Sequence, residues 1–383
     1  MRTSTGPGQG ALSIALVGTR GVPARYGGFE TCVEEVGRRL AARGHRVVVY
    51  CRTAGDAARP AEFLGMQLVH RPAMHKRSLE TLSHTALSVA HLARHRVDAA
   101  IVFNAANAPF LPVMRAAHIS VATHVDGLEW KRTKWSGAGQ RYYKGVEKLS
   151  VRWSDALIAD AAGIAEYYRE TFGARTELIA YGAPRTVGTS TERLAELALD
   201  AGRFHLVVAR FEPENHVLEI VQGYVASAAS MPMVVVGSAP YSDEYTAAIT
   251  AAADSRVRLL GGVWDAELLD QLYVGARTYL HGHSVGGTNP SLLRAIGAGT
   301  ATTAFDVNFN REVLGDSGAY FSSPADVATH LERAESDEDD VTRRGAAALD
   351  RASLYDWDDV TDRYEDLCRR LAARRTTRSQ VTA

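Results

Sequence analysis

The stretch from His281 to Gly299, HGHSVGGTNPSLLRAIGAG, constrains the fold more than any other part of the chain. It follows an apolar run, Ala276 to Leu280, that is typical of a buried strand. A glycine-rich polar loop comes next, and then apolar residues at helical spacing. Pro290 suits the first position of that helix, with Asn289 or Thr288 as its cap. This order of strand, glycine loop and helix predicts backbone N–H groups that can bind an anion.

The N-terminal part of the chain shows a similar order of elements. Ser13 to Val17 is typical of a short buried strand, and a helical pattern runs from Glu30 to Ala42 behind a loop that contains Gly27 and Gly28. Arg46 to Cys51 predicts the next strand. Such a unit begins a doubly wound sheet. The fingerprint G-x-G-x-x-G is absent from the loop, so a bound dinucleotide is not favoured.

Composition and charge narrow the class of protein. The chain has 383 residues, more than one ordinary α/β core needs, and 46% of them are hydrophobic, as in a globular enzyme. A formal net charge of -1 provides no field that would attract nucleic acid. Cys32, Cys51 and Cys368 lie far apart without metal-ligand spacing, so we expect buried, reduced thiols. No apolar run approaches the roughly 18 residues of a membrane span, and the polar N-terminus is unlike a signal peptide. The expected location is the cytoplasm.

Several long motifs resemble one enzyme family. GTRGVPARYGGFET, HVDGLEWKR, RFEPENH and HGHSVGGTNPSLL are similar to segments of retaining glycosyltransferases of family 4, and most similar to the bacterial polysaccharide rhamnosyltransferase-like branch. The resemblance implies the glycosyltransferase-B fold, in which two Rossmann-like, doubly wound α/β domains face each other across a cleft. It also implies that the nucleotide-sugar donor binds in the C-terminal domain and the acceptor mainly in the N-terminal domain.

The resemblance and a break in composition after Pro184 give the expected domain organisation. The predicted parts are a flexible N-terminus (1–11), an acceptor-side Rossmann-like domain (12–184), a linker (185–203), a donor-binding Rossmann-like domain (204–354), a helix that crosses back to the first domain (355–372) and a flexible tail (373–383).

Transfer from a nucleotide donor develops negative charge on the departing diphosphate, which cations and backbone N–H groups can stabilise. Arg210 directly follows a predicted strand and is the expected catalytic cation. By the resemblance, the donor-binding residues are Gly27, Gly28, Arg210, Asn215, His281, His283, Gly286, Gly287, Thr288, Asn289 and Arg294, and the residues that face the nucleobase are Val263 and Trp264. Turn geometry, surface charge and packing are the ordinary alternatives for these residues. The resemblance implies a metal-independent reaction without a cofactor.

The acceptor is expected at the carboxyl end of a strand in the first domain. His124 and Asp126 follow the predicted strand Ile119 to Thr123, at the edge where open α/β sheets bind ligands. One of them is expected to position or polarise the acceptor hydroxyl, while the departing phosphate takes the proton. The predicted catalytic residues are His124, Asp126 and Arg210, and the predicted acceptor-binding residues are Asp126, Glu129, Trp130 and Lys131.

Two departures from the family's pattern concern the donor. Many members carry two glutamates around this strand, loop and helix, and Gly286 and Arg294 stand at those positions here. The resemblance implies that the second glutamate accepts hydrogen bonds from the donor ribose. Arginine has no acceptor atom, so ribose recognition must change or Arg294 must meet an additional anion. A catalytically altered or inactive nucleotide-sugar-binding homologue is therefore an alternative to a hexosyltransferase, and a sugar-nucleotide epimerase on the same fold is a third hypothesis.

The expected partners follow from the leading hypothesis. The donor is a nucleotide-activated hexose or deoxyhexose, and the acceptor is a saccharide, a lipid-linked saccharide or a small metabolite. The segment from Trp130 to Lys148 interleaves basic and aromatic residues, which suits a lipid phosphate, an anionic membrane surface or an ordinary solvated face. A peripheral contact with the inner face of the membrane and a homodimer stay open.

Overall fold

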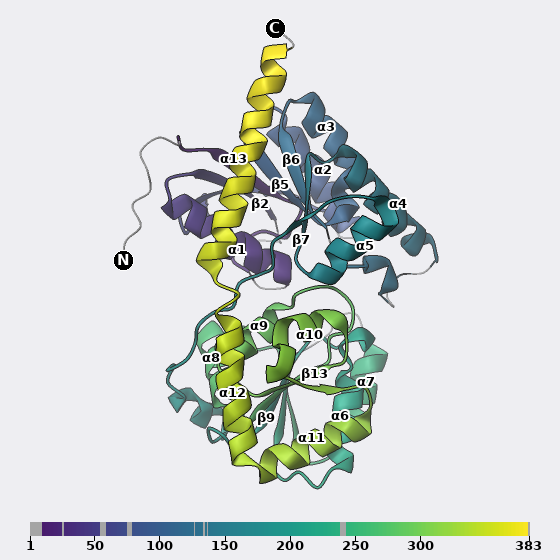
Figure 1. Ribbon diagram of the computed structural model, residues 1–383, viewed down its shortest axis with the longest axis vertical. Coiled ribbons are helices and arrows are strands. Elements are labelled where there is room, and N and C mark those ends of the chain that lie inside the picture. Colours follow the sequence, from purple (N-terminus) through teal and green to yellow (C-terminus); the bar gives the residue numbers. More distant parts are fainter. Residues whose placement is uncertain are drawn as a thin grey trace.

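The computed structural model describes residues 10–24, 27–53, 59–74, 79–125, 127–132, 135, 137–237 and 243–381. Within these residues the chain forms two β-sheets that lie one above the other along the long axis of the molecule, each with helices on both faces (Figure 1). This arrangement confirms the predicted pair of doubly wound α/β domains.

The strands of the first sheet are β1 (Ser13–Val17), β2 (Arg46–Arg52), β3 (Glu62–Phe63), β4 (Met66–Arg71), β5 (Ala99–Phe103), β6 (Ser120–His124), β7 (Ala156–Ala159) and β8 (Glu177–Leu178), and those of the second are β9 (His205–Val208), β10 (Met233–Val236), β11 (Val257–Gly261), β12 (Thr278–His281), β13 (Thr302–Phe305) and β14 (Ala319–Phe321). The α-helices are α1 (Gly28–Ala42), α2 (Glu80–Leu92), α3 (Leu111–Ala116), α4 (Gly137–Trp153), α5 (Ala162–Phe172), α6 (Val217–Ala226), α7 (Asp243–Ala252), α8 (Ala266–Gly275), α9 (Pro290–Gly297), α10 (Asn308–Leu314), α11 (Pro324–Ser336), α12 (Glu338–Ala352) and α13 (Trp357–Val381). Short 3-10 turns are η1 (Ala105–Phe110), η2 (Glu129–Lys131), η3 (Glu192–Leu197), η4 (Pro213–Asn215) and η5 (Gly315–Ser317).

Alternate residues of the first sheet belong to two hydrophobic cores. The strand order is β3-β4-β2-β1-β5-β6-β7-β8, and the described pairings are parallel except that of β3 with β4. Ile14 and Leu16 of β1 pack on the side of α1 and α13, whereas Ala15 and Val17 pack on the side of α2, α3 and α4. A strand that is buried on both faces needs a continuous apolar run, which explains SIALV.

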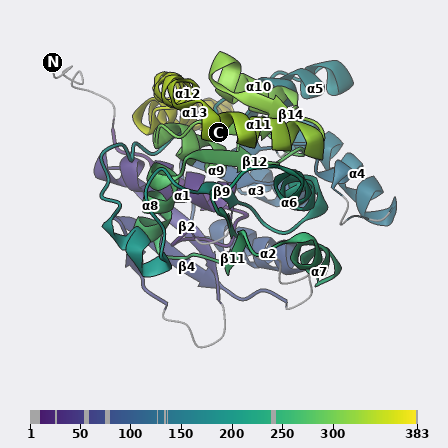
Figure 2. The same ribbon diagram turned by 90° about the horizontal axis from the view of Figure 1, so that it is seen from below.

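The second sheet repeats this two-sided burial. Its order is β11-β10-β9-β12-β13-β14, and its described pairings are all parallel. Helices α8 and α12 lie on one side of the sheet and α6 and α7 on the other, as the view from below shows (Figure 2). Leu206 of β9 belongs to the first of these cores, and its neighbour Val207 belongs to the second. The carboxyl ends of β9 and β12 point toward the first domain.

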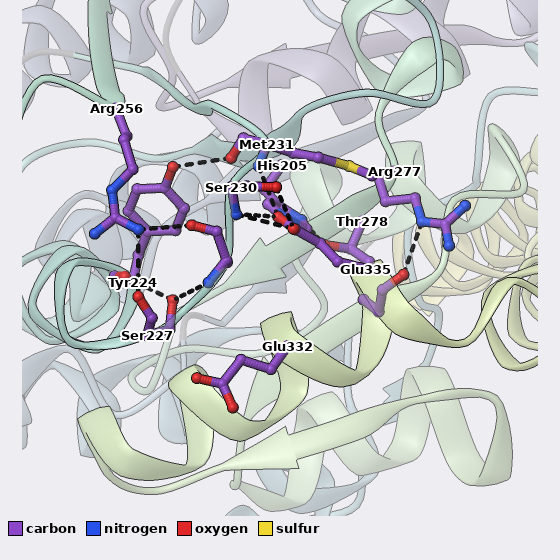
Figure 3. Close-up of polar contacts among 12 residues, drawn as sticks. His205, Tyr224, Ser227, Ser230, Met231, Arg256, Arg277, Thr278, Glu332 and Glu335 are labelled. Carbon is purple, nitrogen blue, oxygen red and sulfur yellow. Dashed lines mark hydrogen bonds and ion pairs between the residues drawn. The ribbon is translucent and has the colours of Figure 1, made fainter.

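A polar cluster ties α11 to the amino ends of these strands (Figure 3). The carboxylate of Glu335 accepts a hydrogen bond of 2.8 Å from the backbone N–H of Ser230 and another of 2.8 Å from that of Met231. It also accepts one from the Ser230 hydroxyl. It also lies 3.2 Å from Nε2 of the buried His205, whose Nδ1 is 2.7 Å from the Thr278 hydroxyl. This cluster lies at the opposite end of the sheet from the glycine loop, so it stabilises the domain rather than the site.

The chain crosses between the domains twice at one place. The backbone N–H of Ala183 donates to the carbonyl of Tyr355 at 2.6 Å, and Gly182 packs on the ring of Trp357. A Cβ at Gly182 would lie 2.4 Å from that ring, which explains the glycine. Beyond the crossing, α13 runs along the first domain (Figure 1), with the Cys32 thiol 3.4 Å from the Tyr364 hydroxyl. The C-terminal helix therefore packs on the first domain.

Several elements differ from their predicted extents. Helix α13 continues to Val381, past the predicted end at residue 372, because no helix-breaking residue follows. Strand β8 is short and ends at Leu178, and the predicted linker contains the 3-10 turn η3. The antiparallel edge strand β3 was not predicted. Residues 1–9 of the predicted flexible N-terminus lie outside the described residues.

Candidate functional site

The glycine loop joins the carboxyl end of β12 to the N-terminus of α9, as predicted. The side chain of Asn289 caps α9 by accepting a hydrogen bond from the backbone N–H of Ser291 at 2.9 Å, and Pro290 occupies the first helical position. Gly286 has φ +137°, a conformation that side chains rarely adopt. The loop thus directs a capped helix N-terminus and its backbone N–H groups toward the first domain.

The loop after β9 is bound tightly to the glycine loop. Asn215 donates from Nδ2 to the carbonyl of Arg210 at 2.8 Å, and its Oδ1 lies 2.7 Å from Nδ1 of His283. The oxygen can only accept, so His283 carries its proton on Nδ1. The lone pair on Nε2 then faces Gly286, where a Cβ would lie 2.9 Å from it. Asn215 therefore fixes the orientation of His283, a role that the sequence did not reveal.

Histidines in this region are buried and neutral. Burial lowers the pKa of His281 to about 3, and its Nδ1 contacts the Tyr279 hydroxyl at 3.0 Å. Burial, with the positive charges of Arg132 and Arg210 among its neighbours, lowers the pKa of His283 well below its usual range. Two arginines from different domains therefore lie near one uncharged imidazole. Guanidinium groups beside a neutral imidazole are donors that can bind an anion.

The two domains touch through the glycine loop. A Cβ at Gly127 would lie 2.4 Å from the backbone of Gly286, and a Cβ at Gly287 would lie 2.1 Å from Oδ1 of Asp160. The hydroxyl of Thr288 donates to the backbone carbonyl of Asp160. Across the same junction, Gly28 packs against Pro290. Gly28 of the first domain therefore lies beside the first residue of α9, and the described arrangement is closed.

Arg132 was not among the predicted site residues, yet it spans the two domains. Its Nε lies 2.5 Å from Glu129 in its own domain, and its Nη1 lies 3.5 Å from Glu214 in the other. Both carboxylates are buried, with 8% and 3% of the side chain exposed. Its place at the end of the motif HVDGLEWKR was the available signal. The predicted acceptor residue Glu129 therefore holds an arginine in this structure.

His124 lies at the carboxyl end of β6, as predicted, but its imidazole is fully buried. It stacks with Phe103 and Tyr181, and Phe29 meets it edge-on at 5.0 Å. Burial lowers its pKa to about 3, so the ring is neutral at ordinary pH. In this closed arrangement His124 contacts aromatic rings instead of solvent. Its predicted partner Asp126 lies outside the described residues.

Arg294 pairs with a carboxylate of its own domain. Its Nε lies 2.8 Å from Oδ1 of Asp270 on α8, and about a quarter of each side chain is exposed (26% and 22%). Burial raises the pKa of Asp270, and the charge of Arg294 opposes that rise. Arg294 is thus paired inside the protein with a residue that the sequence did not single out.

The remaining predicted residues lie at the edges of the site. Trp130 is flanked by the ammonium groups of Lys144, 4.2 Å from its ring centre, and Lys131, at 5.6 Å. Trp264 lies in the loop between β11 and α8. It is 71% exposed, and its ring packs on Gly262. Its neighbour Val263 is half-buried against the core of the second domain. A largely exposed tryptophan leaves one ring face open to a ligand.

The described residues offer neither a metal-binding cluster nor a membrane-spanning helix. Among these residues, no group of three or more His, Cys, Asp or Glu side chains is arranged to hold a metal ion. Within the same part of the chain, no helix combines the length and apolar character that spanning a membrane requires. The three cysteines are buried and unpaired, as predicted.

Comparisons with known proteins place this geometry among solved structures. A family model for a domain of unknown function, DUF1972, matches residues 12–184, and a comparison with curated proteins finds no match. A sucrose-phosphate synthase from Thermosynechococcus elongatus is 18% identical over 94% of this chain and 99% of its own, with a TM-score of 0.81. Anabaena HepE in complex with UDP-glucose is 16% identical over 93% and 99%, with a TM-score of 0.72.

An α,α-trehalose 6-phosphate synthase from Burkholderia multivorans is also similar, at 12% identity over 95% of this chain and 99% of its own, with a TM-score of 0.72. These neighbours are glycosyltransferases with two facing Rossmann-like domains, and the likeness extends over nearly the whole of both chains. The protein therefore has the glycosyltransferase-B fold that the sequence motifs predicted.

Proposed function

We propose that the protein is a retaining, metal-independent glycosyltransferase that moves a hexose or deoxyhexose from a nucleotide-sugar to a hydroxyl acceptor. The observation that carries the proposal is the closed junction around His283. There a capped helix N-terminus and a glycine loop meet Arg210 of the same domain and Arg132 of the other. The complex of Anabaena HepE with UDP-glucose, a protein of the same fold, supports this class of donor. Membership of family 4 and of its rhamnosyltransferase-like branch is part of the proposal.

The donor diphosphate lies, on this proposal, between the glycine loop and Arg210. In the reaction the bond from the anomeric carbon to the diphosphate oxygen breaks, and a bond to the acceptor oxygen forms on the same face of the sugar. The acceptor proton passes to the departing diphosphate, which therefore leaves with one less negative charge. Arg210 and the backbone N–H groups of Gly287 and Thr288 stabilise the charge that develops on the leaving group. His283, held by Asn215, accepts a hydrogen bond from a donor hydroxyl through Nε2.

The acceptor lies in the first domain, on a face that carries positive charge. Arg141, Lys144, Lys148 and Arg152 are exposed on α4 at spacings of three and four residues, so they form one stripe along the helix. Trp130 adds an aromatic ring at one end of this stripe, beside Lys144. A saccharide linked to a lipid phosphate fits such a surface better than a neutral metabolite does. We include in the proposal a cytoplasmic location with contact to the inner face of the membrane, and a homodimer as a further state.

The test is a donor screen. The protein is heated with UDP-, GDP-, dTDP- and ADP-sugars, and any donor that raises the melting temperature is then incubated with acceptors while mass spectrometry detects transfer. Arg210→Ala should weaken donor binding at least tenfold, since it removes a cation from the diphosphate site. Arg169→Ala is the matched control, because Arg169 is 64% exposed on α5 and pairs only with surface glutamates in the described structure. If no nucleotide-sugar stabilises the protein, the proposal is wrong.

A binding protein without turnover is the second candidate, and the Arg294–Asp270 pair favours it. The basic side chain stands where a carboxylate was expected, and its charge is compensated within the protein. The screen separates the two candidates. Stabilisation by a nucleotide-sugar without transfer or hydrolysis, across saccharide, lipid-linked and metabolite acceptors, would support a nucleotide-sugar-binding homologue instead of an enzyme.

A further inference from the structure

Asp160 is a buried carboxyl group at the contact between the domains. It directly follows β7 and lies two residues before the start of α5, and only 6% of the residue is exposed. One carboxyl oxygen, Oδ1, is buried without a hydrogen-bond partner in the described structure. That oxygen points at Gly287 of the other domain, where a Cβ would lie 2.1 Å from it. The closed junction therefore presses an unsatisfied polar atom against the backbone of the glycine loop.

Among the described residues, the groups that interact with Asp160 include no cation. The Tyr181 hydroxyl hydrogen-bonds the carboxyl, and Glu312, from α10 of the other domain, adds a like charge. From the first domain, Cys32 of α1 and Tyr364 of α13 face it, and burial keeps both groups neutral by raising the thiol pKa to about 12 and the phenol pKa well above its usual value. An ionised carboxylate in this place would be desolvated without compensation.

We propose that Asp160 is a proton-gated contact, in which protonation of the Asp160 carboxyl favours closing of the glycine loop on the first domain. This closing would regulate the proposed donor site. Only that effect on donor binding rests on the proposed function. Closing itself needs no nucleotide. Asp160 is a positioning residue, because it touches the loop at Gly287 and Thr288 and not the reacting atoms.

The direction of the pH effect follows from the two states. Burial raises the pKa of Asp160 in the closed arrangement to about 7, with Glu312 adding to the rise and the Tyr181 hydrogen bond opposing it. In an open arrangement the carboxyl meets water and its pKa moves toward the usual value of about 4. Closing therefore takes up a proton between these values. The closed fraction is largest at low pH, falls by up to about tenfold per pH unit as the pH rises toward 7, and is level above it.

Other titratable groups also lie at the junction. The imidazoles of His124 and His281 have pKa values lowered by burial to about 3, so they are neutral throughout the range from pH 5 to pH 8. Glu312 is the main competitor, because burial also raises its pKa, although the backbone N–H of Ala162 and the nearby Arg351 oppose the rise. Its carboxylate caps α5 across the junction, with both oxygens within 3.0 Å of the Ala162 nitrogen. Glu312→Gln is therefore the matched control.

The experiment measures closing without any ligand. Ala90→Cys on α2 and Ala325→Cys on α11 place thiols at exposed positions of the two domains, and the native cysteines are buried, so a fluorophore pair labels only the new sites. Energy transfer is followed from pH 5 to pH 8.5. In the otherwise unchanged chain the closed fraction should fall with rising pH. In Asp160→Asn it should be independent of pH and as large at pH 8 as that of the parent protein at pH 5.

Two outcomes overturn the proposal: a flat profile in the parent protein, or a profile in Asp160→Asn with the parent slope. Asp160→Ser, which also lacks the carboxyl, repeats the test if the asparagine variant does not fold, and Glu312→Gln should keep the slope. UDP-glucose is then added at pH 5.5 and pH 8. If it leaves energy transfer unchanged at both values, UDP-glucose is not the donor, while the ligand-free profile still decides the role of Asp160.

Discussion

Nε of Arg294 lies 2.8 Å from Oδ1 of Asp270, so the basic residue of α9 is bound to a carboxylate of α8. The pair lies between the two helices that follow the predicted nucleobase loop and the glycine loop. A carboxylate is thus present beside α9, although it comes from a different helix than the resemblance implies. In this chain the charge at this place is carried by an ion pair and not by a single glutamate.

Reversing Arg294 tests whether the pair holds the two helices together. Arg294→Glu places a second carboxylate beside Asp270, whose pKa burial already raises. We expect the free energy of unfolding to fall by about 2 kcal/mol, because a half-buried ion pair is replaced by like charges. Chemical denaturation at pH 7 measures the change.

The reversed pair provides the control for that experiment. Arg294→Glu combined with Asp270→Arg restores opposite charges and should recover most of the lost stability. Equal instability of the single and double variants would show that packing, and not charge, governs this contact. Donor binding is measured on both, since weaker binding by the restored pair would place Arg294 itself in contact with the donor.

Gly287 should be required for the closed arrangement. A methyl group in Gly287→Ala would overlap Oδ1 of Asp160, 2.1 Å from the Cβ position, and Ile164, at 2.7 Å. Overlap of this kind costs about 1–3 kcal/mol, so nucleotide-sugar affinity should fall by roughly 5- to 150-fold with the melting temperature little changed. Gly145→Ala on α4 is the control, because nothing lies within 4 Å of its Cβ position. Undiminished affinity in Gly287→Ala would show that the loop does not close on Asp160 in solution.

Arg132 should contribute to donor binding from the other domain. Arg132→Ala removes a cation near His283 and leaves the buried Glu214 facing the site. We expect donor affinity to fall about tenfold or more, with Arg132→Lys intermediate because lysine lacks the planar fork. Lys131→Ala, an exposed neighbour, should change affinity by less than about twofold. Isothermal titration with the best donor of the screen compares the three variants.

His124 is the sharpest test of the predicted catalytic set. Both ring nitrogens are buried, so His124→Phe replaces a buried polar ring by an apolar one among aromatic neighbours. The melting temperature should be unchanged or higher. If His124 positions the acceptor, transfer should nevertheless fall by about 10²-fold or more. Full activity in this variant would reduce His124 to a packing residue.

The sequence predicted the fold because its information is local. Buried parallel strands such as Ser13–Val17 are continuous apolar runs, and the cap of α9 is legible from Asn289 and Pro290 alone. The two-domain architecture followed from the alternation of these elements. Edge strand β3 has only two residues and no apolar pattern, so periodicity gave no sign of it.

Contacts between distant residues could not be predicted in this way. Asp160 and Gly287 are far apart in sequence, and neither the spacing nor the residue types indicate that they touch. The ion pair of Arg294 with Asp270 and the hydrogen bond of Asn215 with His283 likewise depend on how the folded elements pack. Residue types identified the chemistry available at the site, whereas the partners and charge states depend on burial that only the assembled fold defines.

Glu335 should control the acid stability of the second domain. Burial alone would raise its pKa, but hydrogen bonds from His205, Ser230 and Met231 outweigh burial and bring the value to about 2 (Figure 3). A carboxyl with a depressed pKa stabilises the fold above its unfolded pKa of about 4.3, and that contribution is lost as the pH falls toward 2. Glu335→Gln should therefore lower the free energy of unfolding by about 1–3 kcal/mol at pH 7. In this variant the free energy of unfolding should also fall less between pH 4.5 and pH 2.

Glu332→Gln is the control. The Glu332 carboxylate lies one turn away, accepts a single hydrogen bond from the backbone N–H of Ala228, and should change stability by less than about 1 kcal/mol when replaced. Denaturation across this pH range measures both variants, and parallel acid profiles for Glu335→Gln and the parent would assign the acid response to other carboxyls.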